Sequence, residues 1–162
     1  MIAVIACGNP NRRDDGVGSE VMRMLKSGPL GDDSSNVLLL DAGTDGMSVM
    51  FAARGCRTLI VVDACVSGSE PGAVFEVPGQ ELNKPYEPSI NLHDFRWDNA
   101  LHAGRAIFGT DFPSDVIVIL VEAKDLDFGL ELTEPVARAA DTVVRRVEAM
   151  VAERMAAVVD QT

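Results

Sequence analysis

The chain has 162 residues and a net charge of −11 at pH 7, with 14 lysine and arginine residues against 25 aspartate and glutamate residues. This acidic balance disfavours a nucleic-acid partner, because phosphate backbones bind lysine and arginine. A hydrophobic content of 47% excludes a disordered chain and suffices for one domain with a sizeable core, which we expect to span residues 1–162. No apolar run approaches the roughly 18 residues of a membrane span.

The three cysteines, Cys7, Cys56 and Cys65, are odd in number and lack CxxC spacing. This usage favours reduced thiols over a disulfide framework. The first residues also lack the basic cluster that opens a secretory signal. We therefore expect a cytoplasmic protein.

Five apolar runs predict strands, and stretches of helical periodicity separate them. The strands are predicted over residues 2–6, 36–40, 58–63, 73–77 and 115–121, and the helices over 16–27, 46–54, 92–108 and 134–158. Three of the strands are continuously apolar, as in strands covered on both faces, whereas the fourth alternates and carries Glu76, which is typical of an edge. We predict an α/β fold: a three-layer sandwich with a mostly parallel twisted sheet of about five strands, helices on both faces and one antiparallel edge strand.

Four acidic residues lie near the carboxyl ends of the predicted strands, where ligands bind in open α/β sheets. Asp15 follows the first strand within GNPNRRDDGVG (residues 8–18), and Asp41 opens the loop DAGTDG. Asp63 ends the apolar run LIVVD, and Glu122 closes the last strand. Strand ends from distant parts of the chain can bring these carboxylates together.

Each acid also has a purely structural interpretation. Asp14 or Asp15 can cap the helix that follows, and Asp14 is the better candidate for that cap. Asp41 can form a turn with its own backbone, and Glu122 can be a solvated strand end. For Asp63 the functional interpretation is favoured, because a carboxylate at the end of an apolar strand is partly desolvated and needs a partner.

One histidine is a candidate metal ligand. His93 follows the polar segment 78–91, predicted to be a long loop, and precedes a helical pattern; it is either a structural residue, a cap or a ligand. His102 lies nine residues later and points elsewhere. Two carboxylates and an imidazole form a ligand set that suits nickel or zinc and leaves positions open for substrate. HExxH and Cys–His clusters are absent, so we expect no permanently bound metal.

Other common chemistries are not supported. The glycine loop lacks GxxxxGK[ST], and GxGxxG fails at its last position, which disfavours a nucleotide site. There is no GxSxG, and Cys7 has no evident base beside it, so a serine or cysteine nucleophile is unsupported.

Five segments of the chain form a combined pattern: GNPNRRDDGVG, DAGTDG, LIVVDACVSGSEPGAV, SINLHDF and VEAKDLDFGLELTEPV. In order and spacing they resemble the nickel–iron hydrogenase maturation proteases. The resemblance implies a single α/β domain that removes a C-terminal extension from a hydrogenase large-subunit precursor after nickel insertion. This chain departs from the usual family pattern at two positions. It has an aspartate at Asp15, where many members have glutamate, and it has Ala42 as the second residue of the DAGTDG loop.

The resemblance also implies roles for individual residues. It assigns nickel recognition and cleavage to Asp15, Asp63 and His93. It assigns contact with the substrate tail to the DAGTDG loop, through Asp41, Gly43, Thr44 and Gly46. Nickel would arrive with the substrate, and the protein is expected to be a monomer. Nickel either polarises the scissile carbonyl or serves only for recognition while an aspartate acts as general base. The alternative function is a non-enzymatic docking protein or chaperone for the immature large subunit.

Overall fold

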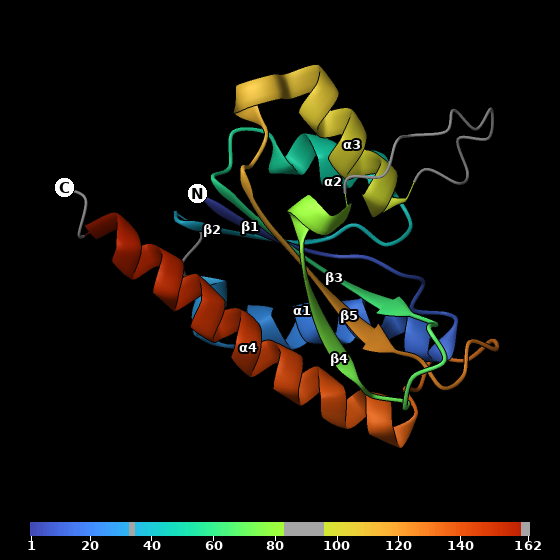
Figure 1. The fold of residues 1–162 in the computed structure, drawn as a ribbon. Helices are drawn as coiled ribbons and strands as arrows, with labels where there is room; N and C mark the ends of the chain where they lie inside the picture. The colour runs from blue at the N-terminus through green and yellow to red at the C-terminus, as the bar shows by residue number, and fades with distance from the viewer. Residues whose placement is uncertain (33–34, 83–95, 160–162) are drawn as a thin grey trace.

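The computed structural model describes residues 1–32, 35–82 and 96–159 and contains one five-stranded sheet (Figure 1). The strands are β1 (Ile2–Ala6), β2 (Val37–Asp41), β3 (Thr58–Cys65), β4 (Val74–Pro78) and β5 (Asp115–Glu122). The helices are α1 (Val17–Ser27), α2 (Gly46–Ala53), α3 (Trp97–Phe108) and α4 (Glu134–Val159). No helix in the described ranges is both long enough and apolar enough to cross a membrane.

The predicted order of strands and helices is confirmed, with shifts of one or two residues at most boundaries. The first four residues of the predicted helix 92–108, and most of the predicted loop 78–91, lie outside the described residues. Within the described part, residues 79–82 form a short 3₁₀ helix after β4.

The strand order is β2-β1-β3-β5-β4. The first four of these strands pair in parallel, and β4 pairs antiparallel to β5 at the edge, as its alternating pattern predicted. The chain leaves β1 for β2 on one side and then crosses to β3 on the other side of β1. The carboxyl ends of β1 and β3 therefore border the position where the strand order reverses, which is where ligands bind in open α/β sheets.

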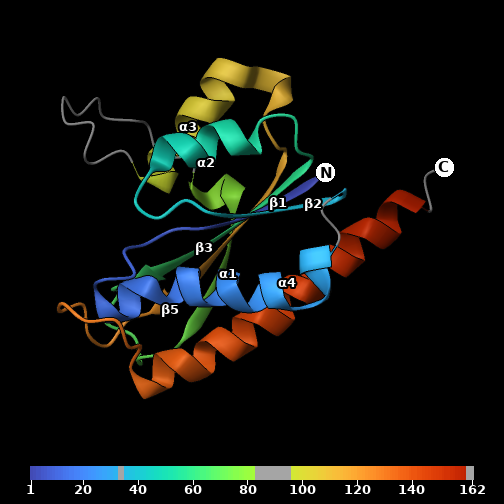
Figure 2. The same ribbon diagram turned by 180° about the vertical axis from the view of Figure 1, so that it is seen from behind.

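Alternating strand residues divide the core into two layers. Ile2, Val4, Ile60 and Val62 pack with α1 and α4 on one face of the sheet. The residues between them, including Ile5 and Val61, pack with α2 and α3 on the other face (Figures 1 and 2). Continuing this period of two along β3 assigns Asp63 to the α2/α3 face.

Gly18 allows the first helix to lie directly against the sheet. A Cβ atom there would be 2.5 Å from the carbonyl oxygen of Cys7 and 3.0 Å from that of Val62. Because both neighbours are backbone atoms, one in β3 and one directly after β1, neither can move aside easily. The small residue therefore sets the distance between α1 and the ends of β1 and β3, which border the site described next.

Candidate functional site

A cavity of about 230 Å³ lies at the carboxyl ends of β1 and β3. Its walls come from the turn after β1, the loop after β2, the end of β3 and the start of α3. The lining residues are Cys7, Gly8, Asp15, Gly43, Thr44, Gly46, Asp63, Arg96 and Trp97. A space of this size accommodates a short extended segment of a chain but not a folded domain.

Backbone hydrogen bonds join the segments around the cavity. The amide of Gly8 donates to the carbonyl of Gly43 at 2.8 Å, and the amide of Cys7 donates to that of Val62 at 2.8 Å. Gly8 has a φ of +119°, and a Cβ atom there would lie 2.0 Å from the carbonyl oxygen of Asp15. Glycine is therefore required at position 8 for the chain to fold back and bring Asp15 to the cavity.

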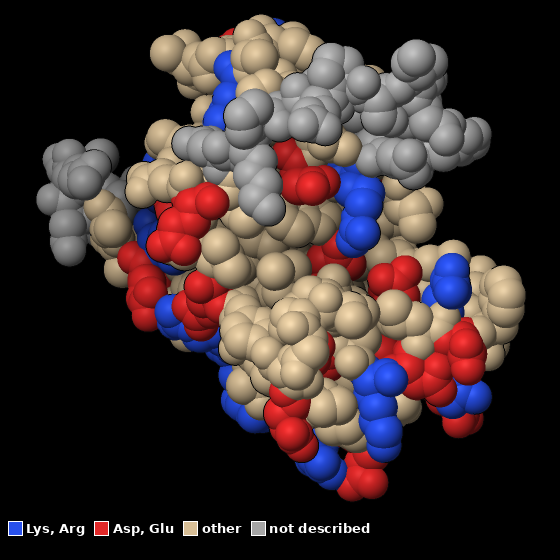
Figure 3. All heavy atoms as spheres, turned by 45° about the vertical axis from the view of Figure 1, so that its right-hand side comes forward, with Lys and Arg blue, Asp and Glu red and all other residues tan. Residues whose placement is uncertain are grey.

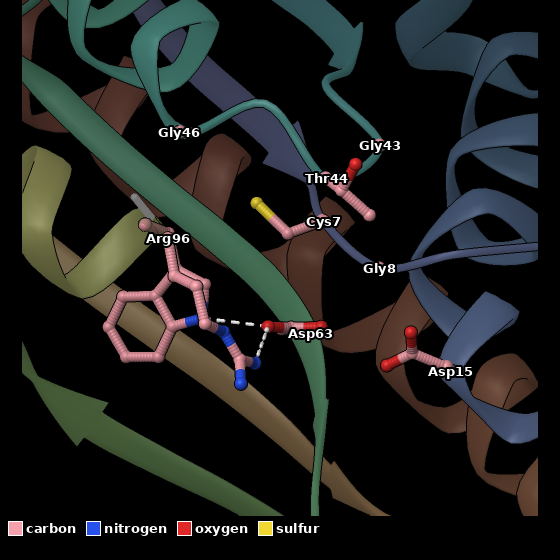
Figure 4. A pocket seen from close by; sticks show the side chains of 9 residues that line it. Cys7, Gly8, Asp15, Gly43, Thr44, Gly46, Asp63 and Arg96 are labelled. Carbon is pink, nitrogen blue, oxygen red and sulfur yellow. Dashed lines mark hydrogen bonds and ion pairs between the residues drawn. The ribbon is translucent and has the colours of Figure 1, made fainter. Parts of the chain in front are cut away.

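Asp15 and Asp63 line this one cavity although 48 positions separate them in the sequence (63 − 15). Figure 4 shows Asp63 with Arg96 on one side and Asp15 on the other. Asp15 is half-buried, and its Oδ2 accepts a hydrogen bond from the amide of Asn9 at 2.9 Å. His93, the third residue assigned to this site by resemblance, lies outside the described residues.

The Asp63 carboxylate is only 2% exposed and has donors on both oxygens. Oδ1 accepts from the amide of Ala64 at 2.8 Å. Oδ2 accepts from the indole Nε1 of Trp97 at 2.7 Å and from a guanidinium nitrogen of Arg96 at 3.3 Å. Burial raises the pKa of Asp63, opposed by the Arg96 charge and by the hydrogen bonds from Ala64 and Trp97, and the negative charge of Asp15 raises it further.

This raised pKa predicts how stability depends on pH. Because folded Asp63 binds its proton more tightly than the unfolded residue, its contribution to stability is fully present below the ordinary pKa of 3.8. That contribution is lost as the pH rises through the raised value. Urea unfolding of wild type and Asp63→Asn over a pH series should show the variant gaining stability relative to wild type above pH 3.8. Parallel curves would mean that Asp63 titrates normally.

Cys7 also lines the cavity, as a buried thiol. Burial raises its pKa, and the charges of Asp63 and Asp41 raise it further. The sulfur is therefore protonated at neutral pH and is not an activated nucleophile. This environment agrees with the absence of a cysteine-nucleophile pattern in the sequence.

Three of the four residues assigned to the DAGTDG loop, Gly43, Thr44 and Gly46, line the cavity. Asp41 is exposed and is not among its lining residues; its Oδ1 accepts from the amide of Gly43 at 3.0 Å. The turn interpretation of Asp41 is thus realised. The loop ends at Asp45, which caps α2 by accepting from the amides of Met47 and Ser48.

Two structural interpretations of the acids are wrong. Asp14 does not cap α1, whose N-cap is Gly16 and has no side-chain cap bond. Instead Asp14 is fully buried, and its carboxylate accepts from the amides of Lys124, Asp125 and Thr133 at 2.8–3.0 Å and from the Thr133 hydroxyl. It fastens the turn after β1 to the segment between β5 and α4, and this holds its neighbour Asp15 in place.

Glu122 is not a solvated strand end. It is 2% exposed, and its carboxylate accepts from the amides of Ser67 and Gly68 and from the Ser67 hydroxyl at 2.7 Å. The Ser67 hydroxyl is the main cause that lowers the pKa of Glu122. The residue anchors the loop after β3 and stays outside the cavity lining.

Sequence reasoning missed Arg96 and Trp97 as residues of the site. Both follow His93 within the stretch HDFRW, which is the signal that was available. Their partner Asp63 lies 33 and 34 residues earlier, so only the packing of α3 on the sheet reveals the contact. His102 is exposed on α3, away from the cavity lining.

Within residues 1–32, 35–82 and 96–159, no group of three or more histidine, cysteine, aspartate and glutamate side chains is placed to hold a metal ion. The described side chains thus offer two carboxylates from different segments at one cavity. Around them, on the face toward which β3 and β5 point, the drawn acidic and basic side chains are interspersed rather than gathered into a broad basic surface (Figure 3). This arrangement disfavours a polyanion as the ligand.

Known proteins match this chain in sequence. Residues 19–150 match the family model described as "Hydrogenase maturation protease" (HycI). A protein of Methanocaldococcus jannaschii named as a hydrogenase maturation protease is 31% identical over 151 residues, which cover 88% of this chain and 91% of that protein.

Solved structures share the fold. An endopeptidase from Escherichia coli superposes with a TM-score of 0.76 at 26% identity, over 95% of this chain and 94% of that one. The hydrogenase maturating endopeptidase HybD from the same organism gives a TM-score of 0.73 at 20% identity, over 95% and 94% of the two chains. At 20% identity, the likeness to HybD shows the fold alone.

Proposed function

Because the chain belongs to the hydrogenase maturation protease family, we propose that it is an endopeptidase that removes the C-terminal extension of a nickel–iron hydrogenase large-subunit precursor after nickel insertion. The observation that carries the proposal is the convergence of Asp15 and Asp63 on one cavity at the point where the strand order reverses. The adjoining Gly43, Thr44 and Gly46 supply a wall along which an extended substrate tail can lie.

Nickel enters this account as part of the substrate. Asp15 and Asp63, with His93, would complete the coordination of an ion carried by the precursor, and two carboxylates with one imidazole suit nickel. A ligand set completed only by the substrate makes cleavage conditional on metal loading. The protein itself needs no resident cofactor in this scheme.

Two roles for the carboxylates lead to the same products. In one, the ion polarises the scissile carbonyl or acidifies the attacking water, and both aspartates serve as ligands. In the other, the ion only positions the tail, and one aspartate takes the proton of the attacking water. Because burial raises the pKa of Asp63, this carboxylate is suited to accept a proton.

The decisive experiment incubates the purified protein with nickel-loaded and with nickel-free precursor and weighs the products by mass spectrometry. Loss of the C-terminal peptide from the loaded precursor alone is expected. A stable complex without any loss of mass would favour the alternative, a non-enzymatic docking protein. Equal cleavage of both precursors would support the protease and refute the role of nickel.

A further inference from the structure

Arg96 and Trp97 both contact Oδ2 of Asp63, yet they differ in how firmly they are held. Trp97 begins α3, is 9% exposed and belongs to the core between α3 and the sheet. The side chain of Arg96 is 64% exposed, and its contact is a single one at 3.3 Å. The indole is therefore a fixed donor, whereas the guanidinium can leave for water at little cost.

The two contacts also serve different needs of Asp63. The Trp97 N–H fixes the orientation of the carboxylate and leaves Oδ1 on the side toward Asp15, as Figure 4 shows. Arg96 supplies the positive charge that a buried carboxylate requires, and it is the cation in contact with Asp63 among the described residues. Orientation is thus built into the core, and charge compensation is carried by a side chain at the mouth of the cavity.

We propose that Arg96 is a resident counter-cation that a divalent ion displaces when it binds between Asp15 and Asp63. The inference rests on the proposed function, because it takes the ion delivered by the substrate as the ligand. Such an ion would place two positive charges within a few ångströms of the guanidinium and repel it. The ion then takes over the compensation of Asp63, while Trp97 keeps the carboxylate in place.

Displacement has a consequence for selectivity. The ion must displace Arg96 from Asp63 before it can bind. A free ion in solution therefore binds more weakly than it would if Asp15 and Asp63 were present without Arg96. An ion fixed in a precursor brings additional contacts from the tail, and these offset the competition. Arg96 therefore favours metal that arrives with the substrate over free metal.

The test measures binding of Ni²⁺ alone, without precursor, by competition with a chromophoric chelator. Arg96→Met should bind Ni²⁺ about three- to fivefold more tightly than wild type, because a like charge near the site is removed and an exposed ion pair of this kind is worth at most about 1 kcal/mol. Arg96→Lys keeps the charge and should bind as wild type does. The difference in Ni²⁺ affinity between wild type and Arg96→Met should become smaller at higher salt, because salt screens the repulsion between the ion and the exposed guanidinium.

Arg138→Met is the matched control. Its side chain is 67% exposed and pairs with Glu134 on α4, so the variant removes the same charge from a similar environment away from the cavity. Its Ni²⁺ affinity should stay within about twofold of wild type. As a second readout, saturating Ni²⁺ should raise the Tm of Arg96→Met more than that of wild type.

The outcomes distinguish the displacement from the function on which it rests. If Asp63→Asn loses Ni²⁺ binding but Arg96→Met binds no more tightly than wild type, the displacement is wrong and the metal site stands. If neither wild type nor Arg96→Met binds Ni²⁺, or if Asp63→Asn binds it as tightly as wild type, the displacement is wrong, and the protease function is then decided by the precursor assay alone. Arg96→Gln replaces Arg96→Met if the latter does not fold.

Discussion

Asp63→Ala is expected to reduce cleavage of the nickel-loaded precursor by roughly 10²–10⁴-fold, the range associated with a positioned acid–base group. The variant removes a carboxylate that both proposed mechanisms require, as ligand or as base. Single-turnover cleavage followed by mass spectrometry measures the loss directly. Circular dichroism and thermal unfolding establish that the variant remains folded, as expected because the deleted carboxylate is itself destabilised by burial.

Glu122→Gln is the control for Asp63→Ala. Glu122 is equally buried and ends the neighbouring strand β5, but its carboxylate faces the loop at Ser67 and Gly68. We expect this variant to cleave the precursor at close to the wild-type rate. Full processing by Asp63→Ala would remove that residue from the catalytic role.

Asp14→Ala is expected to lower the free energy of unfolding by about 3–5 kcal/mol, because three backbone amides and one hydroxyl lose a buried acceptor. The adjacent Asp15→Asn should change it by less than about 1 kcal/mol, since Asp15 is half-buried and its carboxylate accepts one hydrogen bond within the described part of the chain. Urea unfolding at constant m value measures both changes.

The same pair should behave in the opposite way in the cleavage assay. Asp15→Asn removes a proposed ligand and is expected to lose activity while remaining stable. Asp14→Ala should lose activity only to the extent that the turn holding Asp15 loosens, and its remaining activity should fall further on warming. A stable Asp14→Ala protein would contradict the anchoring role assigned to Asp14.

The sequence was sufficient to predict the order of the elements and the edge of the sheet that carries the site. Long apolar runs left few ways to arrange the strands, and parallel pairing gathers their carboxyl ends at one edge. Asp15 and Asp63 could therefore be assigned to a common edge from their positions alone. That Gly43, Thr44 and Gly46 join them follows from the same rule applied to β2.

The different roles of adjacent residues of the same type could not be predicted from the sequence. Asp14 and Asp15 are both acids in one turn, and their roles differ because the partners of Asp14 lie 110 to 119 residues further along the chain. Glu122 was misjudged for a related reason. Its neighbours in sequence are unremarkable, and its burial depends on a loop that returns from the end of β3.

Compensation of the Asp63 charge was equally hidden. A carboxylate at the end of an apolar strand is expected to need a partner, but the sequence does not identify that partner. The helix α3 supplies both Arg96 and Trp97 because it packs on the face of the sheet to which Asp63 belongs. Long-range packing of this kind determines electrostatics that no local pattern encodes.

A crystal structure of the protein soaked in Ni²⁺, with the ion located by anomalous scattering, tests the central claim most directly. We predict one ion in the cavity, at about 2 Å from a carboxylate oxygen of Asp15, a carboxylate oxygen of Asp63 and an imidazole nitrogen of His93. An ion bound elsewhere, or a His93 side chain too remote to share it with the two aspartates, would contradict the claim.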